Sequence, residues 1–349
     1  MDRRRFITTA GQLSASAMMI GLPLSAVAQS RRIVTLGGFR VKVVDIHAHC
    51  DILDVAPLLV GTSMAGANLN RPLGPEWLAR MDSRGIDVAA ISANRFWWYD
   101  AELDLARQIV RLQDDKIAEW CDTHSDRCVQ LSSPALQFPE LAAEQLEYAV
   151  TELGAKGASI LGHARGEVPS TEKYDPFWAK VVELDVPVFM HPDGSRNIIQ
   201  PGVFGGSGGL GNVMGNPLET TLFLARLIYD GTLDRFPELK VIGAHGGGYL
   251  PHYLGRFEQA CDRFSGCVNT KSPAEYLRTQ IFADTMVFNE EGLRHLVAVM
   301  GASQVVYGTD IPHGWADTLD LVLDSPTLSN AEKEAILGGN LVRLLKLDG

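Results

Sequence analysis

Short apolar runs alternate with longer amphipathic stretches along the chain from about residue 40 onward. Each apolar run holds four to six residues. The runs are Val41–Asp45, Asp87–Ser92, Cys128–Leu131, Gly157–Gly162, Val186–Met190, Leu239–Ala244, Gln280–Ala283 and Gln304–Tyr307. Near-continuous apolar runs are typical of strands buried on both faces, as in a parallel sheet. The pattern therefore predicts eight parallel strands.

The stretches between these runs have the period of amphipathic helices. They are Glu76–Arg84, Ala101–His124, Glu140–Leu153, Pro176–Leu184, Pro217–Tyr229, Asn289–Met300 and Asn330–Leu345. Eight strands alternating with helices predict an α/β fold of the (β/α)8 TIM-barrel type. A doubly wound open sheet is the alternative, although no G-x-G-x-x-G follows the first strand. The glycine-rich segment Gly202–Gly215 is expected to form a mobile loop at the active-site mouth.

The first 28 of the 349 residues have the three parts of an export signal. Adjacent arginines open the chain, a mildly apolar stretch follows from Ala10 to Ser25, and Ala26-Val27-Ala28 supplies a cleavage site before Gln29. The arginines before Phe6 are typical of twin-arginine export, which carries folded proteins. We therefore expect a periplasmic protein with one domain over residues 29–349, and a cytoplasmic location is the alternative.

The net charge narrows the range of binding partners, and the cysteine content leaves disulfide pairing open. The net charge is −11, and it becomes −13 when the signal, with three arginines and one aspartate, is removed. An acidic chain lacks the basic footprint that nucleic acids and anionic membranes require, and no run of eighteen apolar residues follows the signal. Among the five cysteines, Cys121–Cys128 or Cys261–Cys267 could pair, but the spacing does not decide it.

Six of the nine histidines lie at or just past the predicted strand ends. His47 and His49 are two residues apart on one strand and so share a face. His191 follows the fifth strand and Asp310 the eighth, and in a barrel the carboxyl ends of all strands meet at one mouth. These four residues predict a site for one divalent metal ion, preferably Zn²⁺, with Mn²⁺ or Fe²⁺ as alternatives.

His245 precedes three glycines at the end of the sixth strand. Glycines let the backbone approach a ligand closely and leave the imidazole uncrowded. We expect His245 to act as a general acid or base beside the metal, because histidine titrates near neutrality. A fourth imidazole ligand and a buried structural histidine are the alternatives, and Asp310 is a second candidate for proton transfer.

Other residues near strand ends are candidates for binding a small carboxylate substrate. Asn94, Arg95 and Trp97 follow the second strand, and His163 and Arg165 follow the fourth. An aromatic cluster there suits a flat organic acid, and an arginine suits its carboxylate. Separately, Asp284 is expected to orient a metal-bound histidine.

The chain resembles the amidohydrolase superfamily, specifically the branch that contains aminocarboxymuconate-semialdehyde decarboxylase and related aromatic-acid decarboxylases. The motifs that carry the resemblance are Asp45-Ile46-His47-Ala48-His49, His191-Pro192, Asn216-Pro217-Leu218-Glu219-Thr220-Thr221, Phe236-Pro237-Glu238-Leu239-Lys240, Ala244-His245-Gly246-Gly247-Gly248, Gly255-Arg256 and Gly308-Thr309-Asp310-Ile311-Pro312. The resemblance implies a metal-dependent TIM barrel in which His47, His49, His191 and Asp310 bind the ion and His245 is catalytic.

Arg256 matches an arginine that, in the decarboxylase, reaches the neighbouring subunit's site and binds substrate carboxylate. The resemblance therefore implies a homodimer. The chain departs from the family at the loops. Asp193 replaces a tryptophan, Phe264 stands where the decarboxylase has a second inter-subunit arginine, and the segment between His49 and Pro75 is short, with Arg71 the arginine near it.

Two activities would use the same predicted site. The first is a carbon–carbon lyase that decarboxylates a small aromatic or muconate-type carboxylic acid, with the metal stabilising the developing anionic charge. The alternative is a hydrolase that opens a lactone, amide or ester through metal-activated water. A non-catalytic periplasmic binding protein is disfavoured because the metal ligands are intact. The preference for decarboxylation rests on the resemblance.

Overall fold

The computed structural model describes residues 31–93, 97–193 and 198–347. The predicted export signal, residues 1–28, and the candidate substrate residues Asn94 and Arg95 lie outside the described residues, so these remain predictions. Among the described residues, no helix is both long and apolar enough to cross a membrane.

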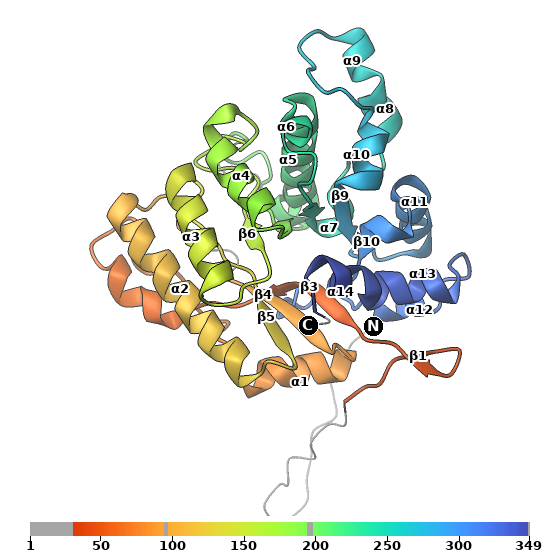
Figure 1. The fold of residues 1–349 in the computed structure, drawn as a ribbon, viewed down its shortest axis with the longest axis horizontal. Coiled ribbons are helices and arrows are strands. Elements are labelled where there is room, and N and C mark those ends of the chain that lie inside the picture. Colours follow the sequence, from red (N-terminus) through yellow and green to blue (C-terminus); the bar gives the residue numbers. More distant parts are fainter. Residues whose placement is uncertain (1–30, 94–96, 194–197, 348–349) are drawn as a thin grey trace, which may run out of the picture.

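Eight parallel strands form a closed barrel, which confirms the predicted (β/α)8 fold (Figure 1). The strands are β3 (Val44–His49), β4 (Val88–Ser92), β5 (Cys128–Gln130), β6 (Ala158–Ile160), β7 (Val188–Met190), β8 (Val241–Gly243), β9 (Ile281–Asp284) and β10 (Val305–Val306). They pair in chain order, as β3-β4-β5 and β6-β7-β8-β9-β10. Two parallel bridges close the ring, Ser132 with Ala158 and Ala48 with Ile311.

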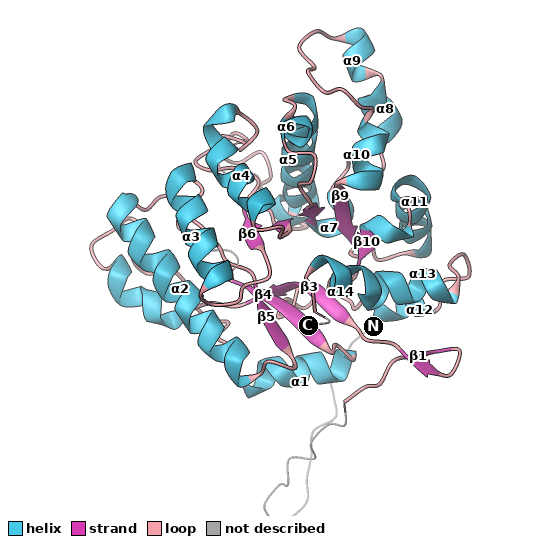
Figure 2. Ribbon diagram, in the orientation of Figure 1, coloured by secondary structure: helices cyan, strands magenta, loops and turns pink. Residues whose placement is uncertain are grey.

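Helices surround the strands, as Figure 2 shows. The longer ones are α1 (Pro75–Arg84), α2 (Leu103–Thr123), α3 (Pro139–Thr151), α4 (Asp175–Glu183), α5 (Asn216–Tyr229), α10 (Pro273–Thr279) and α11 (Glu290–Met300). The shorter ones are α6 (Thr232–Arg235), α7 (Ala244–Gly247), α8 (Leu254–Glu258), α9 (Ala260–Arg263), α12 (Leu319–Leu323), α13 (Asn330–Glu334) and α14 (Asn340–Leu344). Short 3-10 segments lie at Leu53–Leu59, Glu172–Tyr174 and Ala302–Gln304. Helix α10 was not anticipated from the sequence.

The predicted C-terminal helix Asn330–Leu345 is interrupted by a π-helical turn, Ala335–Gly339. The turn packs against the start of the barrel, where Gly338 lies so close to the carbonyl oxygen of Lys42 that a Cβ could not fit. Beyond it, Leu341 and Leu345 pack in the same apolar cluster as Ile46 of the barrel. The terminal segment therefore seals part of the core.

Two features lie outside the repeating pattern. An antiparallel hairpin of β1 (Thr35–Leu36) and β2 (Phe39–Arg40) precedes the barrel. Cys261 and Cys267 form a disulfide just after α8, whereas Cys50, Cys121 and Cys128 are buried free thiols. The glycine-rich segment predicted at Gly202–Gly215 is a largely exposed irregular loop that ends in the π-helical turn Gly211–Gly215. Its mobility remains a prediction.

Candidate metal centre

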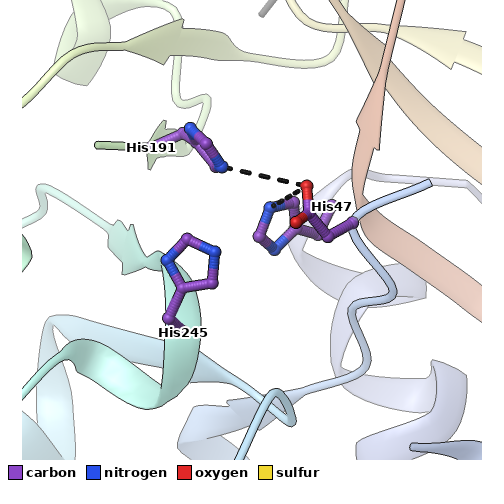
Figure 3. A group of neighbouring side chains, drawn as sticks. His47, His191 and His245 are labelled. Carbon is purple, nitrogen blue, oxygen red and sulfur yellow. Dashed lines mark ion pairs between the residues drawn. The ribbon is translucent and has the colours of Figure 1, made fainter. Parts of the chain in front are cut away.

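Four side chains from different strand ends meet at the carboxyl end of the barrel. His47 lies in β3, His191 follows β7, His245 follows β8, and Asp310 follows β10. One ligand atom from each lies within 4.8 Å of those of the others. Figure 3 shows the three imidazoles pointing toward one another. The sequence places these groups at strand ends, and closure of the barrel brings them together.

His49 belongs to the same cluster. Its Nε2 lies 2.8 Å from Oδ1 of Asp310, and its ring centroid lies 4.6 Å from that of His191 and 4.9 Å from that of His47. The imidazoles of His47, His49, His191 and His245 therefore surround the carboxylate of Asp310. Either His49 or His245 could complete a set with the other three.

Asp284, the last residue of β9, fixes the orientation of His47. Its Oδ2 lies 2.6 Å from Nδ1 of His47, and its Oδ1 accepts a hydrogen bond from the backbone N–H of Gly246 at 2.9 Å. A proton held on Nδ1 leaves Nε2 of His47 as the ligand atom, directed at Asp310 at 3.2 Å. The role expected for Asp284 thus agrees with its contacts.

The backbone at two of the clustered residues has left-handed dihedral angles. His245 has φ 55° and ψ 53°, and Asp310 has φ 59°. Such a conformation costs a non-glycine residue about 1–3 kcal/mol, and it persists where the surrounding structure holds it. The glycine after His245 is confined too, because a Cβ on Gly246 would lie 2.6 Å from Cγ1 of Val287. The strained turns aim both side chains into the mouth.

Burial and the two carboxylates set the charges of the cluster. Burial lowers the pKa of His49 to about 3 and that of His245 to about 4, so both imidazoles are neutral at pH 7. Burial also acts on His47, but Asp310 and Asp284 outweigh it and raise its pKa to about 10. Burial opposes ionisation of Asp310, yet His47 and the other contacts hold its pKa well below the usual range. The cluster thus combines imidazole nitrogens with an anionic carboxylate.

The cluster fits a divalent ion by its chemistry. Both ring nitrogens of His191 and Nδ1 of His245 are buried without a hydrogen-bond partner. Buried polar atoms are rarely left without partners, and several such atoms converging on one point indicate a ligand. Imidazole nitrogen and carboxylate oxygen are donors that suit Zn²⁺, Mn²⁺ and Fe²⁺.

A cavity of about 330 Å³ adjoins the cluster and includes three of the predicted substrate residues, Trp97, His163 and Arg165. The Trp97 ring stacks on His191 with centroids 6.1 Å apart, and its Nε1 donates to the carbonyl of Ser159 at 3.2 Å. Asp193 also lines the cavity. Trp97 therefore places an aromatic surface directly beside the metal cluster.

Arg165 is held by its neighbours. Its Nε donates to the carbonyl oxygen of Tyr99 at 2.6 Å, and its Nη2 donates to that of Ala101 at 3.1 Å. These bonds tie the loop after β6 to the loop after β4. A direct contact between Arg165 and a substrate carboxylate remains a prediction.

Arg256 lies on α8 and faces a different cavity from the one beside the metal cluster. This second cavity has a volume of about 960 Å³. Its lining includes Met214, Leu218, Tyr253 and Phe257. In Figure 1, α8 and α9 project away from the barrel strands. The expected role of Arg256 in a partner subunit's site stays a prediction.

Arg71 is a site residue that sequence reasoning did not assign. Its Nη1 lies 2.5 Å from Nε2 of His313, which lies 4.0 Å from Oδ1 of Asp310. Asp51 holds the arginine, because its Oδ2 accepts the backbone N–H of Arg71 at 2.9 Å and lies 3.4 Å from Nε. The Nη2 atom of Arg71 is buried without a hydrogen-bond partner. Nothing periodic marks Arg71 in the sequence, because it lies in an irregular loop.

A parallel barrel with imidazoles and a carboxylate at its strand ends defines a metal-dependent barrel enzyme. The family model described as Amidohydrolase matches residues 44–347, so the chain belongs to the amidohydrolase family. Similar decarboxylases support the branch of this family that the motifs indicated.

Two relatives and one solved structure are similar over most of the chain. A 2-amino-3-carboxymuconate-6-semialdehyde decarboxylase from Dictyostelium discoideum is 31% identical over 70% of this chain and 67% of its own length. A gamma-resorcylate decarboxylase from Rhizobium radiobacter is 29% identical over 78% of this chain and 86% of its own length. One similar structure is that of a 5-carboxyvanillate decarboxylase from Novosphingobium aromaticivorans, complexed with manganese and 4-hydroxy-3-methoxy-5-nitrobenzoic acid. It is 25% identical to this chain, with a TM-score of 0.78, and the match covers 88% of this chain and 96% of that chain.

Proposed function

We propose that the protein is a metal-dependent decarboxylase of a small aromatic carboxylic acid. One observation carries the proposal: the ligand atoms of His47, His191, His245 and Asp310 lie within 4.8 Å of one another at the mouth of the barrel. The relatives described above are decarboxylases, and they support the lyase over the hydrolase alternative.

His47, His191 and Asp310 would hold the ion, with His49 or His245 completing the set. Zn²⁺ is the proposed ion because an imidazole-rich set with one carboxylate suits it. Manganese in the similar carboxyvanillate decarboxylase supports Mn²⁺ as the alternative. A bound divalent cation supplies positive charge that attracts a substrate carboxylate and stabilises negative charge developing on the ring.

The residues around the cluster would bind and orient the substrate. The ring of the acid would lie against Trp97, whose indole stacks beside His191. The buried Nη2 of Arg71, which lacks a partner, is a suitable donor for a carboxylate or phenolate oxygen. Asp51 and His313 hold the guanidinium in place. A rigid donor positioned in this way orients the substrate at little entropic cost.

The reaction requires one proton transfer. In the free site His245 is neutral and Asp310 is anionic, so one of them takes up a proton as the substrate binds and passes it to the ring carbon that bears the carboxylate. A π electron pair of the ring forms the new C–H bond. The bond from this carbon to the carboxylate then breaks, its electron pair returns to the ring, and CO₂ leaves. Both residues face the cluster from strained turns, so their side chains are held in place before the substrate binds.

We also propose a homodimer. The cavity beside Arg256 is lined largely by apolar side chains of α5 and the segment before it, and of the segment that includes α8 and α9. Tyr253 and Phe264 in its lining are 60% and 63% exposed, which is a large apolar surface to leave in water. A second copy that covers this surface would also allow Arg256 to reach the partner's site, as the family resemblance implies.

Export through a twin-arginine signal remains part of the proposal. The disulfide between Cys261 and Cys267 supports it, because disulfides persist in oxidising compartments such as the periplasm. A cytoplasmic protein would keep these two thiols reduced. Thiol counting on protein purified from the periplasmic and the cytoplasmic fraction separates the two locations.

A substrate screen tests the proposed reaction. Hydroxybenzoic, methoxybenzoic and muconate-type acids are compared with lactones and amides, with CO₂ release and ring opening followed in parallel. We expect CO₂ release from at least one aromatic acid, loss of that activity on chelation, and recovery with one equivalent of Zn²⁺ or Mn²⁺. Hydrolysis of a lactone or amide without any CO₂ would overturn the proposal in favour of the hydrolase.

A further inference from the structure

Glu219 places a buried carboxylate between two strand ends of the barrel. The residue lies on α5 and is 1% exposed. Its Oε1 accepts a hydrogen bond from the backbone N–H of Gly162 at 3.1 Å. Its Oε2 accepts one from the backbone N–H of Asp193 at 3.0 Å. One side chain therefore joins the segment after β6 to the segment after β7.

The two amide groups belong to segments that carry site residues. Gly162 directly precedes His163, which lines the cavity beside the metal cluster. Asp193 follows His191 by two residues, and His191 is one of the clustered metal-ligand candidates. Backbone amides beyond the ends of a strand have no partner in the sheet ladder, so a buried acceptor is needed to hold them. Glu219 provides that acceptor for both segments.

Close packing around Gly162 leaves the Glu219 side chain little room to move. A Cβ on Gly162 would lie 2.9 Å from Cγ and 3.0 Å from Oε1 of Glu219, and 2.5 Å from Cε of Met190. Gly162 does not have a positive φ, so an alanine there would not strain the backbone. The glycine is thus required by the close approach of both Met190 and Glu219, and Gly162→Ala is a probe that disturbs the Glu219 carboxylate without removing it.

We propose that Glu219 is a positioning residue for the metal centre. Its two oxygens fix the spacing between the strand ends of β6 and β7, and through Asp193 they fix the orientation of His191 toward the ion. The inference rests on the proposed metal centre. Residues that orient a metal ligand typically change metal affinity 10- to 100-fold when they are altered. Glu219 differs from Asp284 in acting through backbone amides instead of through an imidazole.

Cobalt binding tests the inference without relying on turnover. The holoenzyme is prepared with Co²⁺, and its visible absorption spectrum and Co²⁺ affinity are measured for wild type, Glu219→Gln and Gly162→Ala. In Glu219→Gln the side-chain NH₂ group of the glutamine faces a backbone N–H that needs an acceptor, so one of the two hydrogen bonds is lost. We expect about 10-fold or weaker Co²⁺ binding and an altered spectrum in both variants, with kcat reduced more than KM is changed.

Gln280→Met is the matched control. Gln280 is also buried, and its Nε2 donates to two backbone carbonyls, those of Leu233 and Phe236, each at 3.0 Å. It directly precedes β9 and so lies at the opposite end of the barrel. This variant should lower the melting temperature but leave the cobalt spectrum and affinity as in wild type.

The possible outcomes separate this inference from the proposed function. If Glu219→Gln folds with wild-type Co²⁺ affinity and spectrum, Glu219 is not a positioning residue and only this inference fails. If Glu219→Gln does not fold, Gly162→Ala decides, and a wild-type spectrum in that variant overturns the inference. A wild-type protein that binds no Co²⁺ would overturn the proposed metal centre and this inference together.

Discussion

The Nδ1 atom of His47 lies 2.6 Å from Oδ2 of Asp284, and both side chains are fully buried. The pair joins β3 to β9 across the mouth of the barrel, and it leaves Nε2 of His47 facing Asp310. A carboxylate in this position selects the tautomer of a metal-bound histidine and raises its basicity. Metal affinity should therefore depend on Asp284, although Asp284 is outside the proposed ligand set.

Replacing Asp284 with asparagine removes the charge and keeps the shape. Metal affinity should fall roughly 10- to 100-fold, because the single neutral oxygen of asparagine cannot accept from both His47 and the Gly246 N–H. Competition with a chromophoric chelator measures the dissociation constant. Asp175→Asn serves as a control, because Asp175 pairs with Arg235 outside the metal cluster, at 3.0 Å. Equal affinities in wild type and Asp284→Asn would show that the pair is purely structural.

His191→Ala should lose bound metal and activity together while the fold survives. The His191 imidazole is part of the cluster, and neither of its ring nitrogens has a hydrogen-bond partner in the protein. Metal content by plasma emission spectrometry and the circular dichroism spectrum provide the measurement. His124→Ala, at the end of α2 outside the cluster, should retain the ion. Full metal occupancy in His191→Ala would rule out His191 as a ligand.

Arg71→Ala should weaken substrate binding and leave the metal in place. A hydrogen bond to a charged group contributes about 1.5–3 kcal/mol, which corresponds to roughly a 10- to 100-fold lower kcat/KM. The loss should appear mainly in KM if Arg71 contacts the carboxylate in the ground state. Arg107→Ala, which removes a surface pair with Glu144, is the control. Unchanged kinetics in Arg71→Ala would exclude a substrate contact.

The stability of the protein should depend on pH through Asp114. Burial raises the pKa of this carboxyl to about 7, although Ser132 and Gln130 donate hydrogen bonds to it. The folded state therefore keeps a proton that the unfolded state releases near pH 4, so the contribution of Asp114 to stability is lost as pH rises from about 4 to about 7.

Asp114→Asn should remove this dependence. Urea unfolding of the wild type and the variant at pH 4.5 and pH 7.5 gives the difference in free energy of unfolding at each pH. The variant should gain stability relative to wild type at the higher pH. A difference that is the same at both pH values would mean that Asp114 is ionised throughout.

The proposed dimer makes a prediction about Phe264. This side chain is 63% exposed at the cavity beside Arg256. Phe264→Glu should convert the dimer to a monomer in sedimentation velocity, because it removes an apolar ring from the proposed interface and adds a charge that must be desolvated there. Phe39→Glu changes a more exposed phenylalanine (79%), in the N-terminal hairpin, and should leave the assembly unchanged. A monomeric wild type would contradict the proposal directly.

The barrel and its metal cluster were predictable because both depend on local pattern. Parallel strands buried on both faces produce near-continuous apolar runs, and all eight runs overlap observed strands. His47 and His191 could be assigned from their places at strand ends, since the fold brings all such ends to one mouth. Position along the chain was enough to predict their proximity.

Contacts between distant loops were not predictable. The Arg71–His313 contact joins residues 242 positions apart in irregular segments, where no periodicity is present. Arg165 was a candidate for substrate binding, and only the folded chain shows its bonds to the carbonyls of Tyr99 and Ala101. The π-helical break at Ala335–Gly339 coincides with the close approach of Gly338 to Lys42, a tertiary contact that helical period alone could not reveal.

Titration of the metal-free enzyme with metal, using a carboxyl-¹³C-labelled aromatic acid as substrate, tests most directly whether the protein is a metal-dependent decarboxylase. Release of ¹³CO₂ should rise with added Zn²⁺ or Mn²⁺, reach its plateau at one ion per chain, and be absent in His191→Ala. Release of ¹³CO₂ at full rate without any metal would contradict the account. So would a metal-saturated enzyme that opens lactones or amides and releases no ¹³CO₂.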